Sequence, residues 1–301
     1  MKINALPVIL LAALLLVCGV SPAGAVRDMS RHPYLGAILV DAATGEVLFE
    51  KNADARGYPA SLVKLMVLQV LLDAIDNGKL SLDDPVTVTS ASSTIGGSQV
   101  YLKDNEVFPV EELLYALMVK SANDAATALA IHYAGSKKAF VKLMNKKARE
   151  IGMHDTIFHS VHGLPPGWRQ KPDVSTPRDI ALLCRVLLKR PRVLKYTSTR
   201  VRAFRTEAKE PFIMRNHNPL LKTVKGCDGL KTGFFSAAGF SIAATARRGG
   251  RRVIAVVMGS KEQKFRDAEA KKLLERGLQQ LAGAASGGDA TGARTRSVKG
   301  K

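Results

Sequence analysis

Runs of apolar residues near the two ends of the chain predict β-strands. Residues 34–41 and 46–50 read as two strands joined by a turn at residues 43–45. Residues 240–247 and 252–259 alternate or run apolar on either side of a Gly-Gly pair, which is typical of a hairpin turn. The chain also takes on strand character from about residue 196.

Helical patterns fill the region between these strands. Residues 61–75 are apolar nearly all round and Gly78 follows as a stop, which predicts a buried central helix. Thr176 and Pro177 form a helix start, with a capping Thr and Pro at the first position. Further helices are predicted over residues 110–119, 123–132, 138–151, 180–189 and 265–281.

Strands at both ends with helices between them indicate an α+β fold, in which one antiparallel sheet is assembled from the first and last thirds of the chain. We see no internal repeat and no second domain. We therefore expect a single catalytic domain over residues 26–281. With 46% hydrophobic residues among 301, the chain can bury a substantial core without covalent staples.

The N-terminus reads as a secretory signal over residues 1–25. Lys2 gives a positive start, residues 8–20 are apolar, and Ala-Gly-Ala at residues 23–25 forms a small-residue cleavage site. The stretch is short for a membrane span. We therefore expect a mature chain that is secreted across the cytoplasmic membrane and lies in the periplasm or cell envelope.

Removal of the signal leaves two cysteines, Cys184 and Cys227. They could form a disulfide in an oxidising compartment. The alternative, two small buried apolar side chains, fits most such cysteines. The sequence leaves both interpretations open.

A net charge of +19 raises the question of a polyanionic partner. No nucleic-acid recognition motif accompanies the charge and aromatic residues are only 6%, so we expect no nucleic acid. Secretion favours anionic envelope polymers instead. Six basic residues lie in residues 137–149, where a solvated helix face is the plain explanation. Residues 282–301 predict a disordered basic tail without the large apolar residues of a membrane anchor.

Three short motifs follow one another along the chain. They are Ser61-Leu62-Val63-Lys64, Ser121-Ala122-Asn123 and Lys231-Thr232-Gly233. Each alone is short enough to arise by chance, so the order carries the evidence. This order is the catalytic set of penicillin-binding proteins and serine β-lactamases.

The residue types suit a serine nucleophile that works without histidine. A helix starting at Ser61 places Lys64 one turn further on the same face. Desolvation by the surrounding leucines and a second cation at Lys231 would lower the pKa of Lys64, so that it can accept a proton. Ser121 could relay a proton to a leaving amine.

The remaining motif residues suit a peptide with a free carboxylate. Asn123 could hold the amide carbonyl of a substrate. Lys231 and Thr232 offer a cation and a hydroxyl to a carboxylate, and Gly233 permits close backbone approach.

Further segments strengthen the pattern between about residues 34 and 281. They are Tyr58-Pro59-Ala60-Ser61, Ser121-Ala122-Asn123-Asp124-Ala125, His162-Gly163-Leu164, Thr176-Pro177-Arg178-Asp179, Asp228-Gly229-Leu230-Lys231-Thr232-Gly233, Ala238-Gly239-Phe240 and Val257-Met258-Gly259-Ser260. With these segments, the chain resembles the low-molecular-mass penicillin-binding proteins that act as serine D-Ala-D-Ala carboxypeptidases.

The resemblance implies a penicilloyl-serine transferase fold and a reaction with no cofactor and no metal. Ser61 would form an acyl-enzyme with the penultimate D-Ala of a peptidoglycan stem peptide, releasing the terminal D-Ala, and β-lactam antibiotics would be covalent inhibitors. The backbone amides of Ser61 and Phe234 would form the oxyanion hole. Arg266 matches a basic position near the substrate carboxylate, although a plain surface arginine fits the sequence equally well.

Two features depart from the family pattern. Many members carry a second, β-rich domain and a C-terminal amphipathic anchor, and neither is evident in this sequence. Phe234 and Phe235 follow Gly233 and make an apolar rim, which would alter substrate preference.

Three alternative functions remain to be weighed. A D,D-endopeptidase that cuts peptidoglycan cross-links would use every catalytic residue named above. A class A β-lactamase needs a Glu-x-x-Leu-Asn segment after the second motif, and none follows Asn123. A non-catalytic wall-binding protein would not need a nucleophile with its base, and here Ser61 and Lys64 are both intact.

Overall fold

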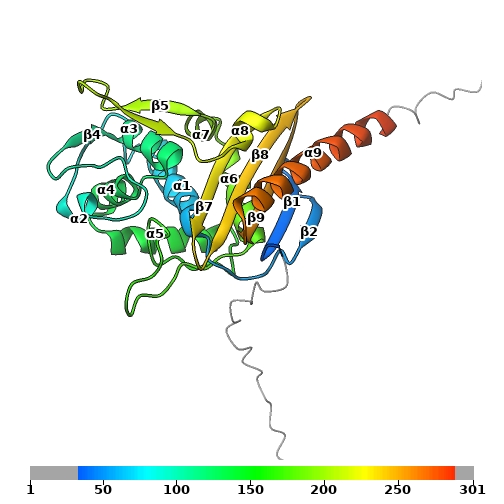
Figure 1. The fold of residues 1–301 in the computed structure, drawn as a ribbon, viewed down its shortest axis with the longest axis horizontal. Helices are drawn as coiled ribbons and strands as arrows, with labels where there is room; N and C mark the ends of the chain where they lie inside the picture. The colour runs from blue at the N-terminus through cyan, green and yellow to red at the C-terminus, as the bar shows by residue number, and fades with distance from the viewer. Residues whose placement is uncertain (1–32, 289–301) are drawn as a thin grey trace, which may run out of the picture.

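Five antiparallel strands from the two ends of the chain form the central sheet, in the order β2-β1-β9-β8-β7 (Figure 1). The computed structural model describes residues 33–288, so the predicted signal at residues 1–25 lies outside the described residues. The predicted α+β arrangement is confirmed. The strands are β1 (Gly36–Asp41), β2 (Val47–Lys51), β7 (Cys227–Phe235), β8 (Gly239–Arg248) and β9 (Arg251–Ser260).

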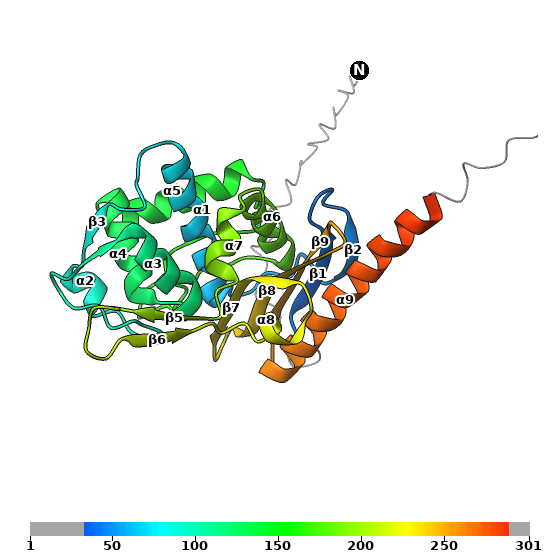
Figure 2. The same cartoon turned by 90° about the horizontal axis from the view of Figure 1, so that it is seen from above.

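The sheet is apolar on both faces, and alternate residues of β9 serve different cores. Val253, Ala255 and Val257 pack with the helix α9 (Gln263–Gly288). Ile254, Val256 and Met258 belong to the larger core on the other face. In Figure 2, α9 covers one side of the sheet and most of the other helices gather on the opposite side, although Leu220, from a short helix, belongs to the core beneath α9. A strand buried on both faces explains why β9 reads as an unbroken apolar run.

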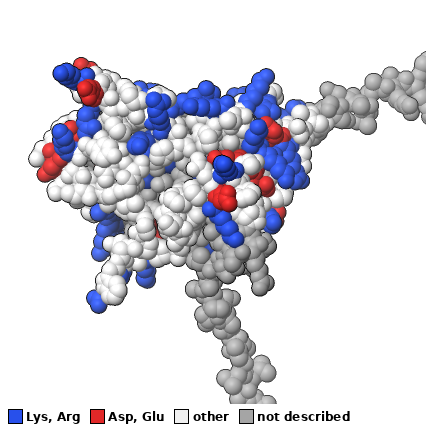
Figure 3. Space-filling view, in the orientation of Figure 1, with Lys and Arg blue, Asp and Glu red and all other residues white. Residues whose placement is uncertain are grey.

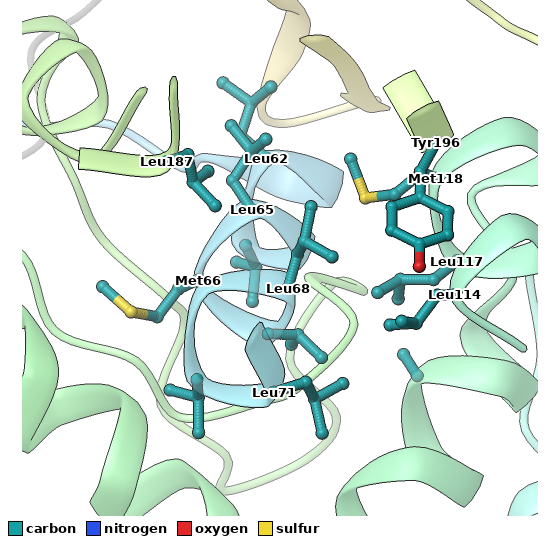
Figure 4. Packing of buried hydrophobic residues seen from close by; sticks show 14 of the residues in the cluster. Leu62, Leu65, Met66, Leu68, Leu71, Leu114, Leu117, Met118, Leu187 and Tyr196 are labelled. Carbon is teal, nitrogen blue, oxygen red and sulfur yellow. The ribbon is translucent and has the colours of Figure 1, made fainter. Parts of the chain in front are cut away.

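The helix α1 (Val63–Asp76) lies at the centre of the larger core. Leu65, Met66, Leu68 and Leu71 are fully buried and point in different directions around the helix (Figure 4). Each buried leucine contributes about 1.5–3 kcal/mol relative to an exposed one. Side chains of α3 (Val110–Tyr115), α4 (Asn123–Ala134), α5 (Lys137–Glu150) and α6 (Pro177–Leu188) complete this core.

Several short helices and strands were not predicted from the sequence. Two hairpins stand apart from the central sheet, and both are too short to show a clear alternation. The expected strands after residue 196 begin only at Val201, because α7 continues to Thr197. These elements are β3 (Pro85–Thr87), α2 (Ser90–Ser93), β4 (Val107–Pro109), α7 (Arg192–Thr197), β5 (Val201–Phe204), β6 (Phe212–Arg215) and α8 (Leu220–Thr223).

The last helix differs from its predicted end. It continues to Gly288, whereas the predicted tail begins at residue 282. The alanines within this stretch are strong helix formers, and a composition-based argument gives them too little weight. The predicted tail from residue 289 onward lies outside the described residues.

Both cysteines are free. Cys184 is fully buried on α6, where burial raises the pKa of its thiol, and Cys227 is partly buried at the start of β7. The structure thus contains no disulfide between these two residues, and Cys184 fits the interpretation of a buried apolar side chain whereas Cys227 is only partly buried. Within residues 33–288, no helix combines the length and the apolar character needed to cross a membrane.

Candidate active site

Ser61 lies in a single 3-10 turn, Ala60–Leu62, that leads directly into α1. The α-helix proper therefore begins two residues after Ser61 and not at it. Pro59 precedes the turn and ends the extended segment. Lys64 still lies on the same face as Ser61, because three residues of 3-10 or α geometry nearly complete one turn.

Lys64 is the most enclosed charged residue of the site. Its side chain is 0% exposed, and its Nζ lies 3.0 Å from Ser61 Oγ. The same Nζ lies 2.7 Å from Asn123 Oδ1 and 2.7 Å from the main-chain oxygen of His162. Three acceptors saturate an ammonium group and direct one of its hydrogens to the serine oxygen.

Burial lowers the pKa of Lys64 well below the usual value for lysine, and the nearby Lys231 lowers it further. The carboxylates of Asp173 and Asp124 oppose this shift. The direction expected from the sequence is thus present in the structure. A lysine with a lowered pKa can accept the Ser61 proton, which is the requirement for a general base.

The second motif starts where a turn of π-helix, Ala116–Lys120, ends. Ser121 adopts the left-handed conformation, with φ 60° and ψ 33°, and is 3% exposed. Asn123 follows at the start of α4, and its Nδ2 donates to the main-chain oxygen of Gly96 at 2.8 Å. Lys64 contacts Asn123, and Ser121 is not among its three hydrogen-bond partners.

The third motif lies on β7, an edge strand of the sheet that passes close to the Ser61 turn. A Cβ atom at Gly233 would lie 2.8 Å from the main-chain oxygen of Pro59 and 3.0 Å from the amide nitrogen of Ser61. Only glycine permits this approach. It brings the Ser61 amide beside the Gly233–Phe234 backbone, as an oxyanion hole requires.

Lys231 and Arg266 form the cationic side of the site. Both are at least 97% buried, since Lys231 is 2% and Arg266 is 3% exposed. Burial and the charge of Arg266 lower the pKa of Lys231 to about 7. Arg266, at the start of α9, forms an ion pair with Asp267, donating to its Oδ1 from both Nε and Nη2, while its Nη1 donates to the main-chain oxygen of Ser241 at 3.5 Å. The structure thus places Arg266 at the cleft and not on an open helix surface.

A cleft of about 450 Å³ joins all three motifs, and none of the side chains that line it is acidic. Ser61 reaches it from the turn before α1, Ser121 and Asn123 from the second motif, and Thr232 and Gly233 from β7. With Arg266 in its lining and Lys231 close to Arg266, such a cleft suits an anionic ligand. Its lining residues are Ser61, Gly97, Ser98, Ser121, Asn123, Gly163, Leu164, Pro165, His217, Thr232, Gly233, Phe234, Phe240, Gln263 and Arg266.

The two phenylalanines after Gly233 each belong to an aromatic pair, and the pair of Phe234 and Phe240 lines the cleft. Phe234 is 53% exposed and stacks on Phe240, with ring centroids 4.1 Å apart. Phe235 stacks on Tyr58 at 5.7 Å. The apolar rim expected from the sequence is thus a rigid stacked platform.

Four groups near the site lie outside the three sequence motifs. The His162 oxygen belongs to the main chain, and Gly163 packs on the Ser61 turn with φ +75°. Asp173 holds the preceding segment by accepting hydrogen bonds from the amides of residues 159 and 160 at 2.6 and 2.8 Å. His217 lines the cleft, where burial and neighbouring cations lower its pKa to about 4. The His162-Gly163-Leu164 segment was the only sequence signal near these groups.

No group of three or more His, Cys, Asp or Glu side chains is arranged to hold a metal ion in the described part of the chain. The donors around Ser61 are a lysine, hydroxyls and an amide, which suit proton transfer and hydrogen bonding.

Comparison with known proteins agrees with this geometry. The family model described as D-alanyl-D-alanine carboxypeptidase matches residues 31–262. The D-alanyl-D-alanine carboxypeptidase DacF of Bacillus subtilis is 36% identical over 244 residues, which cover 81% of this chain and 62% of that protein. The chain therefore spans about three fifths of the length of this relative.

Solved structures of the same family share the fold. Penicillin-binding protein 5 from Haemophilus influenzae superposes with a TM-score of 0.76 at 33% identity, covering 82% of this chain and 71% of that one. Penicillin-binding protein D2 from Listeria monocytogenes in its ampicillin-bound form superposes with a TM-score of 0.71 at 35% identity, covering 82% and 97%. Three motifs that meet in one cleft, the family match and the shared fold together establish that this chain belongs to the D-alanyl-D-alanine carboxypeptidase family.

Proposed function

We propose that this protein is a serine D-Ala-D-Ala carboxypeptidase that removes the terminal D-Ala from peptidoglycan stem peptides through an acyl-enzyme on Ser61. The observation that carries the proposal is the 3.0 Å contact between Ser61 Oγ and a fully buried Lys64 Nζ, in a cleft with no acidic lining. Membership of the family supports the reaction type.

Acylation starts from neutral Lys64. Lys64 removes the proton as Ser61 Oγ attacks the carbonyl carbon of the penultimate D-Ala. The negative charge that develops on the carbonyl oxygen is stabilised by the amides of Ser61 and Phe234. The terminal D-Ala leaves as an amine after it takes a proton from Lys64. Ser121 lines the same cleft but is not among the hydrogen-bond partners of Lys64, so it would act as the relay only once the substrate amine lies between them.

The cationic wall selects a substrate that ends in a carboxylate. Lys231 and Arg266 supply positive charge, and Thr232 supplies a hydroxyl at the cleft. The side-chain oxygen of Asn123 accepts a hydrogen bond from Lys64 Nζ, and its side-chain nitrogen donates one to the main-chain oxygen of Gly96. These two bonds fix the orientation of the amide. Its place on the wall of the cleft supports a role in holding the peptide.

Hydrolysis of the acyl-enzyme needs a water and a base. Departure of the D-Ala frees Lys64 and the space that the amine occupied, so water can attack the ester. The leaving group of penicillin remains covalently tethered to the acyl-enzyme, so it does not free this space. In addition, no carboxylate lines the cleft to activate a water. We therefore expect penicillin to form an adduct that lasts minutes or longer.

The test uses isolated peptidoglycan and follows the muropeptides by mass spectrometry. Loss of a single D-Ala from pentapeptide stems supports the carboxypeptidase. Conversion of cross-linked dimers to monomers would show the endopeptidase instead. Catalytic consumption of penicillin without a protein adduct would show a β-lactamase. The proposal includes secretion to the periplasm or cell envelope, because peptidoglycan, the proposed substrate, lies there.

A further inference from the structure

A second, larger cavity lies between α5 and residues 157–162. Its volume is about 940 Å³, roughly twice that of the 450 Å³ catalytic cleft. Its inner wall, residues 157–162, continues directly into residues 163–165, which line the catalytic cleft. We call this cavity the α5 groove. Its size falls within the range of ligand sites, about 300–1,000 Å³.

Basic side chains from α5 line the groove, and no acidic side chain does. Figure 3 shows blue side chains at the lower left of this face, near the position of α5 in Figure 1. The five cations are Lys137, Lys138, Lys142, Lys146 and Arg149.

The charges on this helix are not balanced at the groove. Lys147 is not among the residues that line the groove. Its Nζ forms ion pairs with Asp73 Oδ2 at 2.9 Å and with Glu150 Oε2 at 2.7 Å. Lys146 reaches Glu150 only at 3.9 Å. Within residues 33–288, the other four groove cations form no ion pair. Like charges spaced three and four residues apart repel one another, so an anionic ligand would relieve a repulsion built into the helix.

Apolar side chains also line the groove, and two of them are exposed; we call them its apolar floor. Leu143 is 37% and Ile157 is 41% exposed, and Val141 lies beside them. Asn145 and Gln170 add amide groups to the lining. A bare phosphate polymer would leave the apolar floor unused. A peptide with methyl side chains and free carboxylates would contact both the floor and the cations.

The groove is held rigidly to the catalytic base. Asp173 fixes the shared wall, because it accepts from the amide of Ser160 at 2.8 Å and from Ser160 Oγ at 2.6 Å. Two residues later, the His162 oxygen accepts from Lys64 Nζ. The groove therefore shares its inner wall with the segment that provides an acceptor to Lys64.

We propose that the α5 groove is a second substrate site, which binds the carboxylate-bearing stem peptide of a neighbouring strand while a D-Ala-D-Ala end occupies the catalytic cleft. The inference rests on the proposed function, since it takes the same polymer as substrate. Two sites on one polymer raise its effective concentration at Ser61.

The test measures binding rather than turnover. All variants carry Ser61→Ala so that the polymer is not cut, and each is sedimented with peptidoglycan stripped of phosphodiester polymers. The groove variant is Lys138→Glu with Lys142→Glu. The matched control, Lys271→Glu with Lys272→Glu, makes the same charge change on exposed residues of α9. Circular dichroism checks that each variant is folded, and Lys138→Gln with Lys142→Gln repeats the test without reversal of charge.

We expect the groove variant to raise the apparent dissociation constant about tenfold and the control to change it less than about twofold. Amidation of the peptidoglycan carboxyls should weaken binding of the Ser61→Ala chain to a similar extent. Equal losses in the groove variant and the control would overturn the proposal. So would a groove effect that appears only with inorganic polyphosphate as the probe. Penicillin labelling of the native chain tests the proposed function separately, whatever the groove binds.

Discussion

The ammonium nitrogen of Lys64 and the main-chain oxygen of His162 lie 2.7 Å apart, although 98 residues separate them in the chain. The contact places Lys64, the proposed general base, between the helix α1, which carries it, and a segment that Asp173 holds by hydrogen bonds. Asp173 thus acts on Lys64 in two ways: it positions the acceptor, and its charge raises the pKa of the lysine against the effect of burial.

Replacement of Asp173 by Asn should shift the pH dependence of acylation. Loss of the carboxylate charge lowers the pKa of Lys64 further, so Lys64 is neutral at lower pH and the acid limb of the acylation rate moves to lower pH. The measurement is the rate of penicillin acylation between pH 4 and 9. Ser160→Ala removes one hydrogen bond to Asp173 but keeps its charge, so its acid limb should stay in place. Coincident acid limbs in all three proteins would show that Asp173 has only a structural role.

Lys231 should set the alkaline limb of peptide turnover. Its pKa in the free protein is about 7, and its charged form is the one that attracts a substrate carboxylate. The value of kcat/KM should therefore fall as the pH rises through this region. Lys231→Arg keeps its charge throughout, so the alkaline limb near neutral pH should disappear even if the overall rate is lower. An unchanged limb in this variant would assign the titration to another group.

Lys231 should also lower stability at neutral pH. Its pKa in the folded chain, about 7, lies below the ordinary value of 10.5, so between these values the unfolded chain binds more protons and stability rises with pH. Lys231→Met should therefore raise the free energy of unfolding by a few kcal/mol at pH 6.5, with a smaller gain at pH 10. Urea unfolding at the two pH values measures the difference. A gain that is equal at both would show that packing, and not charge burial, causes it.

The close approach of β7 to the Ser61 turn should not tolerate a methyl group. Gly233→Ala would place a Cβ atom 2.8 Å from the Pro59 oxygen and 3.0 Å from the Ser61 amide. The strand or the turn must move, which separates the two oxyanion amides, and we expect acylation to slow at least about a hundredfold. Stopped-flow measurement of penicillin acylation, with thermal unfolding as a check on the fold, distinguishes this from general instability. An acylation rate near that of the native chain would show that the Gly233 contact is not needed.

The sequence predicted the elements whose pattern is set by a single local rule. The apolar run of residues 61–75 and the capping Thr176 each predicted a helix, and the paired strand patterns predicted the sheet. The motif residues also meet in one cleft, as their order implied. The π-turn before Ser121 could not be predicted, because it depends on how the end of α3 packs and not on residue type.

The supporting groups of the site were harder to foresee. The acceptor at His162 is a main-chain oxygen, which has no residue-type signature. Asp173 and His217 reach the site only through tertiary packing. The α5 lysines read equally well as a solvated face until the structure placed an apolar floor and a second wall beside them.

The central claim is that Ser61 is the acylated nucleophile, and intact-protein mass spectrometry after exposure to penicillin tests it most directly. The account predicts one penicilloyl adduct per native chain, stable for minutes or longer because no carboxylate lines the cleft to activate a water. It predicts no adduct on folded Ser61→Ala, and little on Lys64→Ala, since members of one catalytic unit do not contribute additively. Undiminished labelling of Ser61→Ala would contradict the account, as would a native chain that consumes penicillin without ever carrying the adduct.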